Sequence, residues 1–159
     1  MPSDPAIDEI DARILLKVNE NPRATTVALA DEVGVARNTA HARLTRMEQN
    51  GALGSPERRV NPAALGYPLS AFITTTVRQS RLDEVSGALA GIPEVLQVHG
   101  VSGAADVLVH VVATDAEDLY RIAGQILAVP DVERTNTALV MRQLVDYRIT
   151  PLLRRVAEG

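Results

Sequence analysis

The sequence predicts an α+β protein: an N-terminal helix-turn-helix domain joined by a hinge strand to a ferredoxin-like βαββαβ domain. Two short amphipathic helices meet at a glycine in the first third of the 159-residue chain, which is typical of a helix-turn-helix. The second half contains an internal repeat with a period of 37 residues, whose copies each read strand, helix, turn, strand. We place the first domain at residues 1–60, a linker at 61–69, and the second domain with a C-terminal tail at 70–159.

The first helix is predicted over residues 7–18, where isoleucine, leucine and valine recur at helical spacing. Acidic residues occupy its first turn, which favours the helix dipole. Thr25 is a suitable N-cap for a second helix over residues 26–33, which Gly34 can end because glycine tolerates positive φ. The third helix is predicted over residues 37–50, with Ala36, a residue without a capping side chain, at its start.

The outer face of this third helix carries mostly short polar side chains, namely Arg37, Asn38, His41, Ala42 and Thr45. Such a face can enter a DNA major groove, where its first residues meet base edges. Arg43 and Arg46 flank it and are candidates for phosphate contacts. An ordinary amphipathic helix with a solvated polar face explains the same pattern, so both interpretations stay open.

Charge is divided unevenly along a chain whose net charge is -4. Residues 36–59 hold five arginines and two glutamates, whereas residues 68–159 hold 8 arginines and 11 acidic residues. A local basic patch suffices for phosphate contacts. The chain has no cysteine, which excludes disulfides and thiolate metal sites, and no apolar run that could span a membrane or act as a signal peptide. We expect a cytoplasmic protein without cofactor or metal.

The order IDEIDARIL, VALADEVGVARNTAHARLTRMEQNGAL and VNPAALGYP resembles the Lrp/AsnC (feast/famine) family of bacterial and archaeal transcription regulators. The resemblance implies binding to double-stranded DNA, with Thr39 and Arg43 in the recognition helix and a hinge ending near Asn61–Pro62. Two departures stand out. Ala36 replaces the family's usual serine N-cap, and Ser55–Pro56 stands where Gly-Tyr is common.

The hinge strand is predicted over residues 53–60, short or at an edge because Pro56 cannot donate a ladder hydrogen bond. In the repeat, Ile92–Val95 superposes on Val129–Val132. We expect the two repeat helices to begin at Ser80 and at the capping box Thr114–Glu117. Two βαβ units give the split ferredoxin-like order, with both helices on one sheet face; the family's effector domain has the same order.

The opposite sheet face is expected to be bare. If Gln97 opposes His110 and His99 opposes Leu108, this face carries Val95, Gln97, His99, Val101, Leu108, His110 and Val112. The helix side would carry Leu96, Val98, Val107, Val109 and Val111. A mixed aliphatic face suits a second copy of the chain, so we expect a homodimer. The resemblance suggests higher assemblies of dimers.

One loop, Gly100–Asp106, is the candidate small-molecule site. Its glycines let a ligand approach backbone amides, which suit a carboxylate, and Asp106 suits an ammonium group. The resemblance implies an effector site built from Gly100, Ser102, Gly103 and Asp106, completed by Thr135 and Thr137 of a neighbouring dimer, with a small amino acid or a related molecule as effector. A plain hairpin turn that needs glycine is the alternative, and Ala105 departs from the aromatic residue common in the family.

No catalytic pattern stands out: no Ser-His-Asp set, no paired carboxylates and no phosphate-binding glycine loop. The three histidines have no carboxylates beside them in register. We therefore predict a sequence-specific DNA-binding transcriptional regulator that is not an enzyme. The alternatives are a ligand-sensing module that acts on a protein partner and a DNA-architectural protein with little sequence preference.

Overall fold

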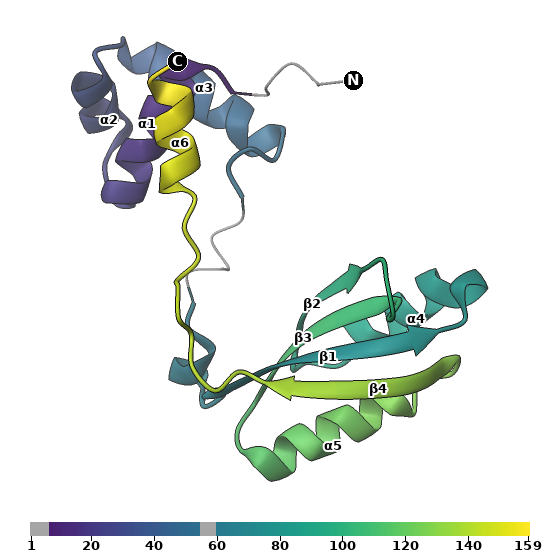
Figure 1. Cartoon of the computed structure of the whole chain (residues 1–159). Coiled ribbons are helices and arrows are strands. Elements are labelled where there is room, and N and C mark those ends of the chain that lie inside the picture. The colour runs from purple at the N-terminus through teal and green to yellow at the C-terminus, as the bar shows by residue number, and fades with distance from the viewer. Residues whose placement is uncertain (1–6, 55–59) are drawn as a thin grey trace. The chain divides into compact units, whose positions relative to one another are not determined.

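The computed structural model describes residues 7–54 and 60–159, except the side chain of Gln79. The chain forms two compact units (Figure 1). The first combines the N-terminal helices with residues 145–159, and the second ends at Leu144. The last residues, expected as a tail of the second domain, thus pack with the first.

The first unit begins with helix α1, Glu9–Glu20. Its N-cap is Asp8, whose carboxylate accepts the backbone N–H of Asp11 at 2.8 Å, while Asp11 accepts that of Asp8 at 3.0 Å. This reciprocal capping box satisfies two backbone donors at the helix start. The helix ends at its C-cap Asn21, and it begins and ends two residues later than predicted.

Helices α2, Thr26–Val33, and α3, Arg37–Gln49, form the helix-turn-helix. Three local predictions are confirmed. The hydroxyl of Thr25 caps α2 at 3.2 Å from the N–H of Ala28. Gly34 ends α2 in the left-handed region with φ of 77°. Ala36 gives α3 no side-chain cap.

A further helix, α6, Thr150–Ala157, completes the first unit and was absent from the sequence prediction. It lies alongside α1 (Figure 1). The buried core of the unit consists of Ile14, Leu15, Val33, Met47 and Leu153, so one of its members comes from the end of the chain. Leu153 is 6% exposed.

The predicted hinge strand, residues 53–60, falls mainly outside the described residues, and its described ends, residues 53, 54 and 60, are not in a strand. The following linker contains a short 3-10 helix, Pro62–Leu65. The side chain of Asn61 caps this helix through the N–H of Ala63 at 3.0 Å. Gly66 ends it with φ of 91°.

The second unit has the predicted βαββαβ order. Its strands are β1 Leu69–Val77, β2 Val95–Gly100, β3 Val107–Ala113 and β4 Val132–Leu139. Its helices are α4 Leu82–Ala90 and α5 Ala116–Leu127. The sheet is antiparallel in the order β2-β3-β1-β4. The central strands β1 and β3 bury Ala71, Ile73, Val107, Val109 and Val111 against Val85 and Leu89 of α4 and Ile122 and Ile126 of α5.

The predicted helix starts are both wrong. A 3-10 turn, Gln79–Arg81, precedes α4, so the helix begins after Ser80 and has no side-chain cap. Helix α5 is capped by Asp115, which accepts the N–H of Asp118 at 2.8 Å. Asp118 in turn accepts the N–H of Thr114 at 3.0 Å. Several Ser, Thr and Asp residues lie close together at each start, so the sequence alone did not identify the capping residue.

The register of the β2–β3 hairpin is confirmed, since Gln97 opposes His110 and His99 opposes Leu108. Two face assignments, those of Val95 and Leu96, are wrong. An irregularity between Val95 and Gln97 brings Val95 opposite Val111 and packs it against the core. Leu96, expected on the helix side, is 45% exposed. A bulge adds one residue and exchanges the faces on one side of it, which alternation alone cannot reveal.

Candidate DNA-binding and effector sites

The predicted reading face of α3 is exposed in the first unit. Side chains of Arg37, Asn38, Thr39, His41 and Ala42 are exposed, and Thr45 is half-buried. The opposite side is anchored by Ala40 and Met47, both fully buried. Burial of this side fixes the rotation of α3 about its axis, which leaves the polar face outward for a partner.

Arg43 and Arg46 flank this face of α3 and bond within the unit. The Arg43 Nη1 lies 2.6 Å from Asp8 and 2.9 Å from Asp11, and Arg46 Nη2 also donates to Asp11. The carboxylate of Asp11 is fully buried, so the two arginines neutralise a charge that water does not reach. Glu32 on α2 does not join this cluster and instead pairs with Lys17 at 3.6 Å.

The electrostatics of this cluster agree with its geometry. The hydrogen bond from Arg43 lowers the pKa of the Asp8 carboxyl, helped by the backbone N–H of Asp11. In return, the hydrogen bonds to Asp8 and Asp11 raise the pKa of Arg43. Both groups are therefore charged near neutral pH, and the Arg43 charge is largely compensated before any phosphate approaches.

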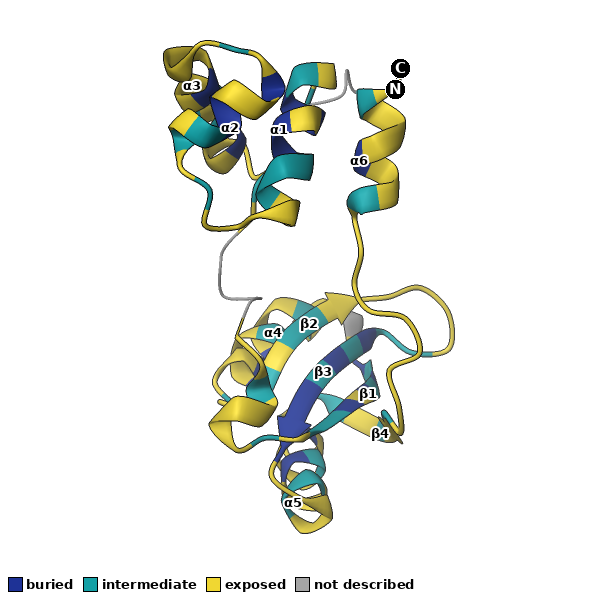
Figure 2. Cartoon of the chain, turned by 90° about the vertical axis from the view of Figure 1, so that its left-hand side faces the viewer, coloured by how far each residue is buried: buried dark blue, intermediate teal, exposed yellow. Residues whose placement is uncertain are grey.

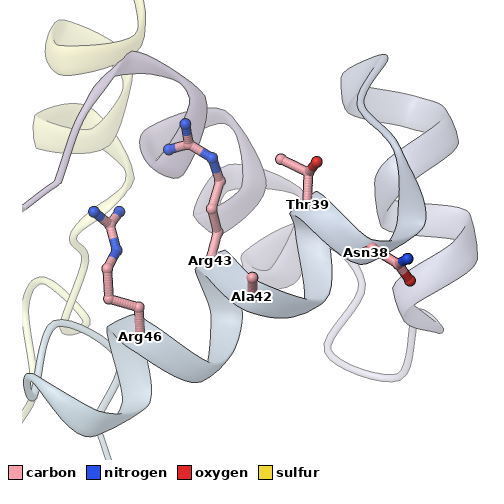
Figure 3. Close-up of a pocket in the computed structure, with 5 residues that line it drawn as sticks. All are labelled: Asn38, Thr39, Ala42, Arg43 and Arg46. Atoms are coloured by element: carbon pink, nitrogen blue, oxygen red, sulfur yellow. The ribbon is translucent and has the colours of Figure 1, made fainter.

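Figure 3 shows how these side chains are arranged along α3. Arg43 and Arg46 extend to the same side of the helix, while Asn38 points elsewhere near its beginning. Together with Thr39 and Ala42 they line an open concavity. The small side chain of Ala42 lies between the longer flanking residues.

In the second unit, the loop Gly100–Asp106 closes the β2–β3 hairpin. Gly103 has φ of 114°, a positive value that the turn requires and that glycine adopts without strain. The Asp106 carboxylate accepts the backbone N–H of Val77 at 2.9 Å, and its own N–H donates to the carbonyl of Thr75 at 3.0 Å. Asp106 thus ties the loop to β1, which supports the turn interpretation and leaves its second carboxylate oxygen for a ligand.

Thr135 and Thr137 lie on the edge strand β4, opposite Thr75 and Ile73 of β1. This register puts both threonines on the sheet face that carries the helices. Thr75 is 1% exposed, and its hydroxyl has no hydrogen-bond partner among the described residues. Within one chain, Thr75 of β1 therefore lies between Asp106, which bonds to its backbone, and Thr135 of β4, which is directly opposite it. Ser102 and Gly103 are exposed at the tip of the loop.

The open sheet face carries a compact aromatic pair. The rings of Phe72 and His110 are stacked, with centroids 4.7 Å apart and planes 19° from parallel. Ser70 lies 2.8 Å from Nε2 of the same histidine. Burial, with a smaller contribution from the charge of His99, lowers the pKa of His110. Phe72 is nevertheless 38% exposed on a central strand, so in the described chain this face is not covered.

Comparison with protein families now identifies both units. The model of the AsnC-type helix-turn-helix domain matches residues 7–48, and that of the Lrp/AsnC ligand-binding domain matches residues 70–150. The chain belongs to the Lrp/AsnC family. This result confirms the predicted resemblance and the fold class, and the family consists of transcriptional regulators rather than enzymes.

Relatives of this Lrp/AsnC chain are similar over most of their length. The HTH-type transcriptional regulator AldR of Mycolicibacterium smegmatis is 34% identical, over 87% of this chain and 83% of that protein. FL11 of Pyrococcus horikoshii is 29% identical, over 86% and 90%. Escherichia coli AsnC superposes with a TM-score of 0.81 at 24% identity, covering 91% of this chain and 99% of AsnC.

A regulator from Neisseria meningitidis, solved as a complex with L-Met, superposes with a TM-score of 0.77 at 23% identity, covering 88% of this chain and 93% of that one. At these identities the last two comparisons show the fold. In the part of the chain that the structure describes, no helix is long and apolar enough to cross a membrane. Nor do three or more His, Asp or Glu side chains gather there around a possible metal position.

Two features of the first unit escaped the sequence analysis. The hydrophobic spacing of residues 149–156, with Leu152, Leu153 and Val156, signals a short amphipathic helix that could have been recognised. The pairing of Asp11 with Arg43 and Arg46 could not, because it joins residues 32 to 35 positions apart. Only the packing of α1 against α3 brings these groups together.

Proposed function

We propose that this Lrp/AsnC chain is a sequence-specific DNA-binding transcriptional regulator whose binding responds to a small amino-acid-like effector. The observation that carries the proposal is the exposed polar face of α3, whose opposite side is buried through Ala40 and Met47. Asn38 and His41 supply hydrogen-bonding groups for base edges, and Ala42 supplies a methyl group for apolar contact with thymine.

A single helix of this length contacts few bases, so we propose that a dimer binds two half-sites. The open sheet face around Phe72 and His110 is the proposed dimer interface, since aliphatic and aromatic groups lie there without cover in the described chain. Assemblies of several dimers would bring further half-sites into reach. Double-stranded DNA and a second copy of the chain are therefore the proposed partners.

The effector proposal rests on the chemistry of the Gly100–Asp106 loop. Backbone amides at its exposed glycines and serine suit a carboxylate, and the Asp106 oxygen that accepts from no described residue suits an ammonium group. Thr135 and Thr137 are proposed to add hydroxyl groups. The Neisseria meningitidis regulator that was solved with L-Met shares only the fold with this chain. We use that complex only to choose amino acids as test ligands.

A genome-wide map of bound sites, followed by titration of the strongest site, tests the proposal. We expect a common motif with two half-sites about one helical turn apart, and specific binding at least about 10³-fold tighter than binding to unrelated DNA. Salt-dependent binding with a ratio near one would favour the DNA-architectural alternative. A protein-regulating module would show neither salt-dependent binding nor a motif.

A further inference from the structure

The C-terminal helix α6 sits in the same unit as the recognition helix and carries two adjacent arginines. Leu153 is 6% exposed in the shared core with Ile14 and Met47. This anchor holds α6 on α1, and the C-terminal end of α6 lies beside the start of α1 (Figures 1 and 2). Charges on α6 therefore belong to the surface of the helix-turn-helix unit.

Arg154 and Arg155 project away from that anchor. With 3.6 residues per turn, they lie about 100° and 200° around the helix from Leu153. Both side chains are exposed. Among the described residues no carboxylate pairs with either one, although Glu158 follows directly after the helix as its C-cap. Each guanidinium is thus available to an external anion.

The rest of the unit offers few such cations near α3. Residues 7–54 contain six Lys or Arg and seven Asp or Glu, so the helix-turn-helix alone is slightly acidic. Its two flanking arginines on α3, Arg43 and Arg46, are bonded to Asp8 and Asp11. Of the arginines on α3, only Arg37 has no carboxylate partner among the described residues. Arg58 and Arg59 lie outside the described residues.

The arginines of α6 lie near the half of α3 whose own arginines are already paired. The start of α1, which α6 flanks, is the segment that bonds to Arg43 and Arg46 in the second half of α3. A duplex along the exposed face of α3 would have Arg37 near one end of the helix and α6 beside the other. Guanidinium groups bind phosphate through two parallel hydrogen bonds, which positions a protein on DNA without reading sequence.

We propose that α6 is a second DNA-contacting element, in which Arg154 and Arg155 bind phosphates of the duplex that α3 reads. The inference rests on the proposed DNA-binding function and adds to it a contact outside the helix-turn-helix. It also gives the end of the chain a role in the first unit beyond filling its core.

The test is the salt dependence of binding to a random-sequence 30-base-pair duplex, measured by fluorescence anisotropy on the full chain. Each phosphate contact contributes about 0.9 to the slope of log affinity against log salt. The variant R154Q/R155Q should lower the slope by about 1.8 per bound protomer and weaken binding at low salt. Gln has a helix propensity similar to that of Arg, so α6 should persist, as circular dichroism can check.

Two further variants complete the design. R154K/R155K should keep most of the slope, because lysine retains the charge. R142Q/R148Q removes the same charge from exposed positions before α6 and should change the slope less. An R154Q/R155Q slope equal to that of the wild type, or an equal loss in R142Q/R148Q, would overturn the inference alone. A wild-type chain that binds no duplex at low salt would overturn the proposed function as well.

Discussion

The guanidinium of Arg43 on α3 lies 2.9 Å from the fully buried carboxylate of Asp11 on α1. Asp11 also accepts from the backbone of Asp8 and from Arg46. One carboxylate thus completes the capping box of the first helix and fastens the recognition helix to it. Arg43, chosen from the sequence for phosphate contact, has a structural partner that the sequence did not indicate, and its contact with DNA stays a prediction.

Arg43→Ala should destabilise the first unit. Removing one partner of a buried ion pair typically costs 3–5 kcal/mol, and we expect about 2–3 kcal/mol because Arg46 still neutralises Asp11. Urea unfolding followed by circular dichroism measures the change. Arg37→Ala, at an exposed position with no ion pair to any described residue, is the matched control. If Arg43→Ala unfolds like the wild type but loses DNA affinity and salt dependence, Arg43 acts on phosphate rather than on Asp11.

Asn38→Ala and His41→Ala should each cost about 1–3 kcal/mol of binding free energy on the cognate site and little on random DNA. The reason is that exposed side chains on the outer face of α3 read base edges rather than the backbone. Paired titrations of the two duplexes measure the difference. Equal losses on both duplexes would assign these residues to backbone contact.

Phe72→Glu and Val101→Glu should each convert a dimer into a monomer. Both residues are 38% exposed, and Phe72 stacks on His110 in the middle of the open face. Burying a carboxylate in an apolar interface without a partner is strongly unfavourable. Light scattering at micromolar concentration gives the mass, and Tyr120→Glu, at an exposed position of α5, is the control. A monomeric wild type would refute the interface.

Asp106→Asn should abolish effector binding while the chain stays folded. Asparagine keeps an oxygen that can accept the N–H of Val77, so the loop survives, but the charge that suits an ammonium group is lost. Calorimetric titration of the twenty amino acids against wild type and variant measures this. An Asp106→Asn variant that binds as tightly as the wild type, or a wild type that binds none of them, would refute the site.

Acid should destabilise the second unit through His110. Its pKa is lowered from 6.5 by burial and by His99, so near pH 6 the unfolded chain binds more protons than the folded one. Stability from this group is therefore complete above the unfolded pKa and is lost as pH falls below it. His110→Gln should show a smaller loss of unfolding free energy between pH 7.5 and 5.5 than the wild type. His41→Gln, in the first unit, should behave like the wild type.

Local pattern by itself determined much of this protein. Hydrophobic spacing with Thr25 and Gly34 defined α2 and its turn into α3, since caps and positive φ depend on neighbouring residues. The 37-residue repeat determined the βαββαβ order, and alternation in β3 determined which residues face the helices. The resemblance to the Lrp/AsnC family, carried by motifs in both halves, was likewise legible from the sequence.

Contacts between distant residues were decided only by the tertiary structure. The return of Leu153 to the core of the first unit and the bonding of Arg43 and Arg46 to Asp11 depend on which helices pack together. The bulge that turns Val95 inward depends on cross-strand pairing with β3. Burial then changed the chemistry of these groups, because an arginine beside a buried carboxylate is neutralised within the protein, whereas an exposed arginine on α6 keeps its charge for a partner.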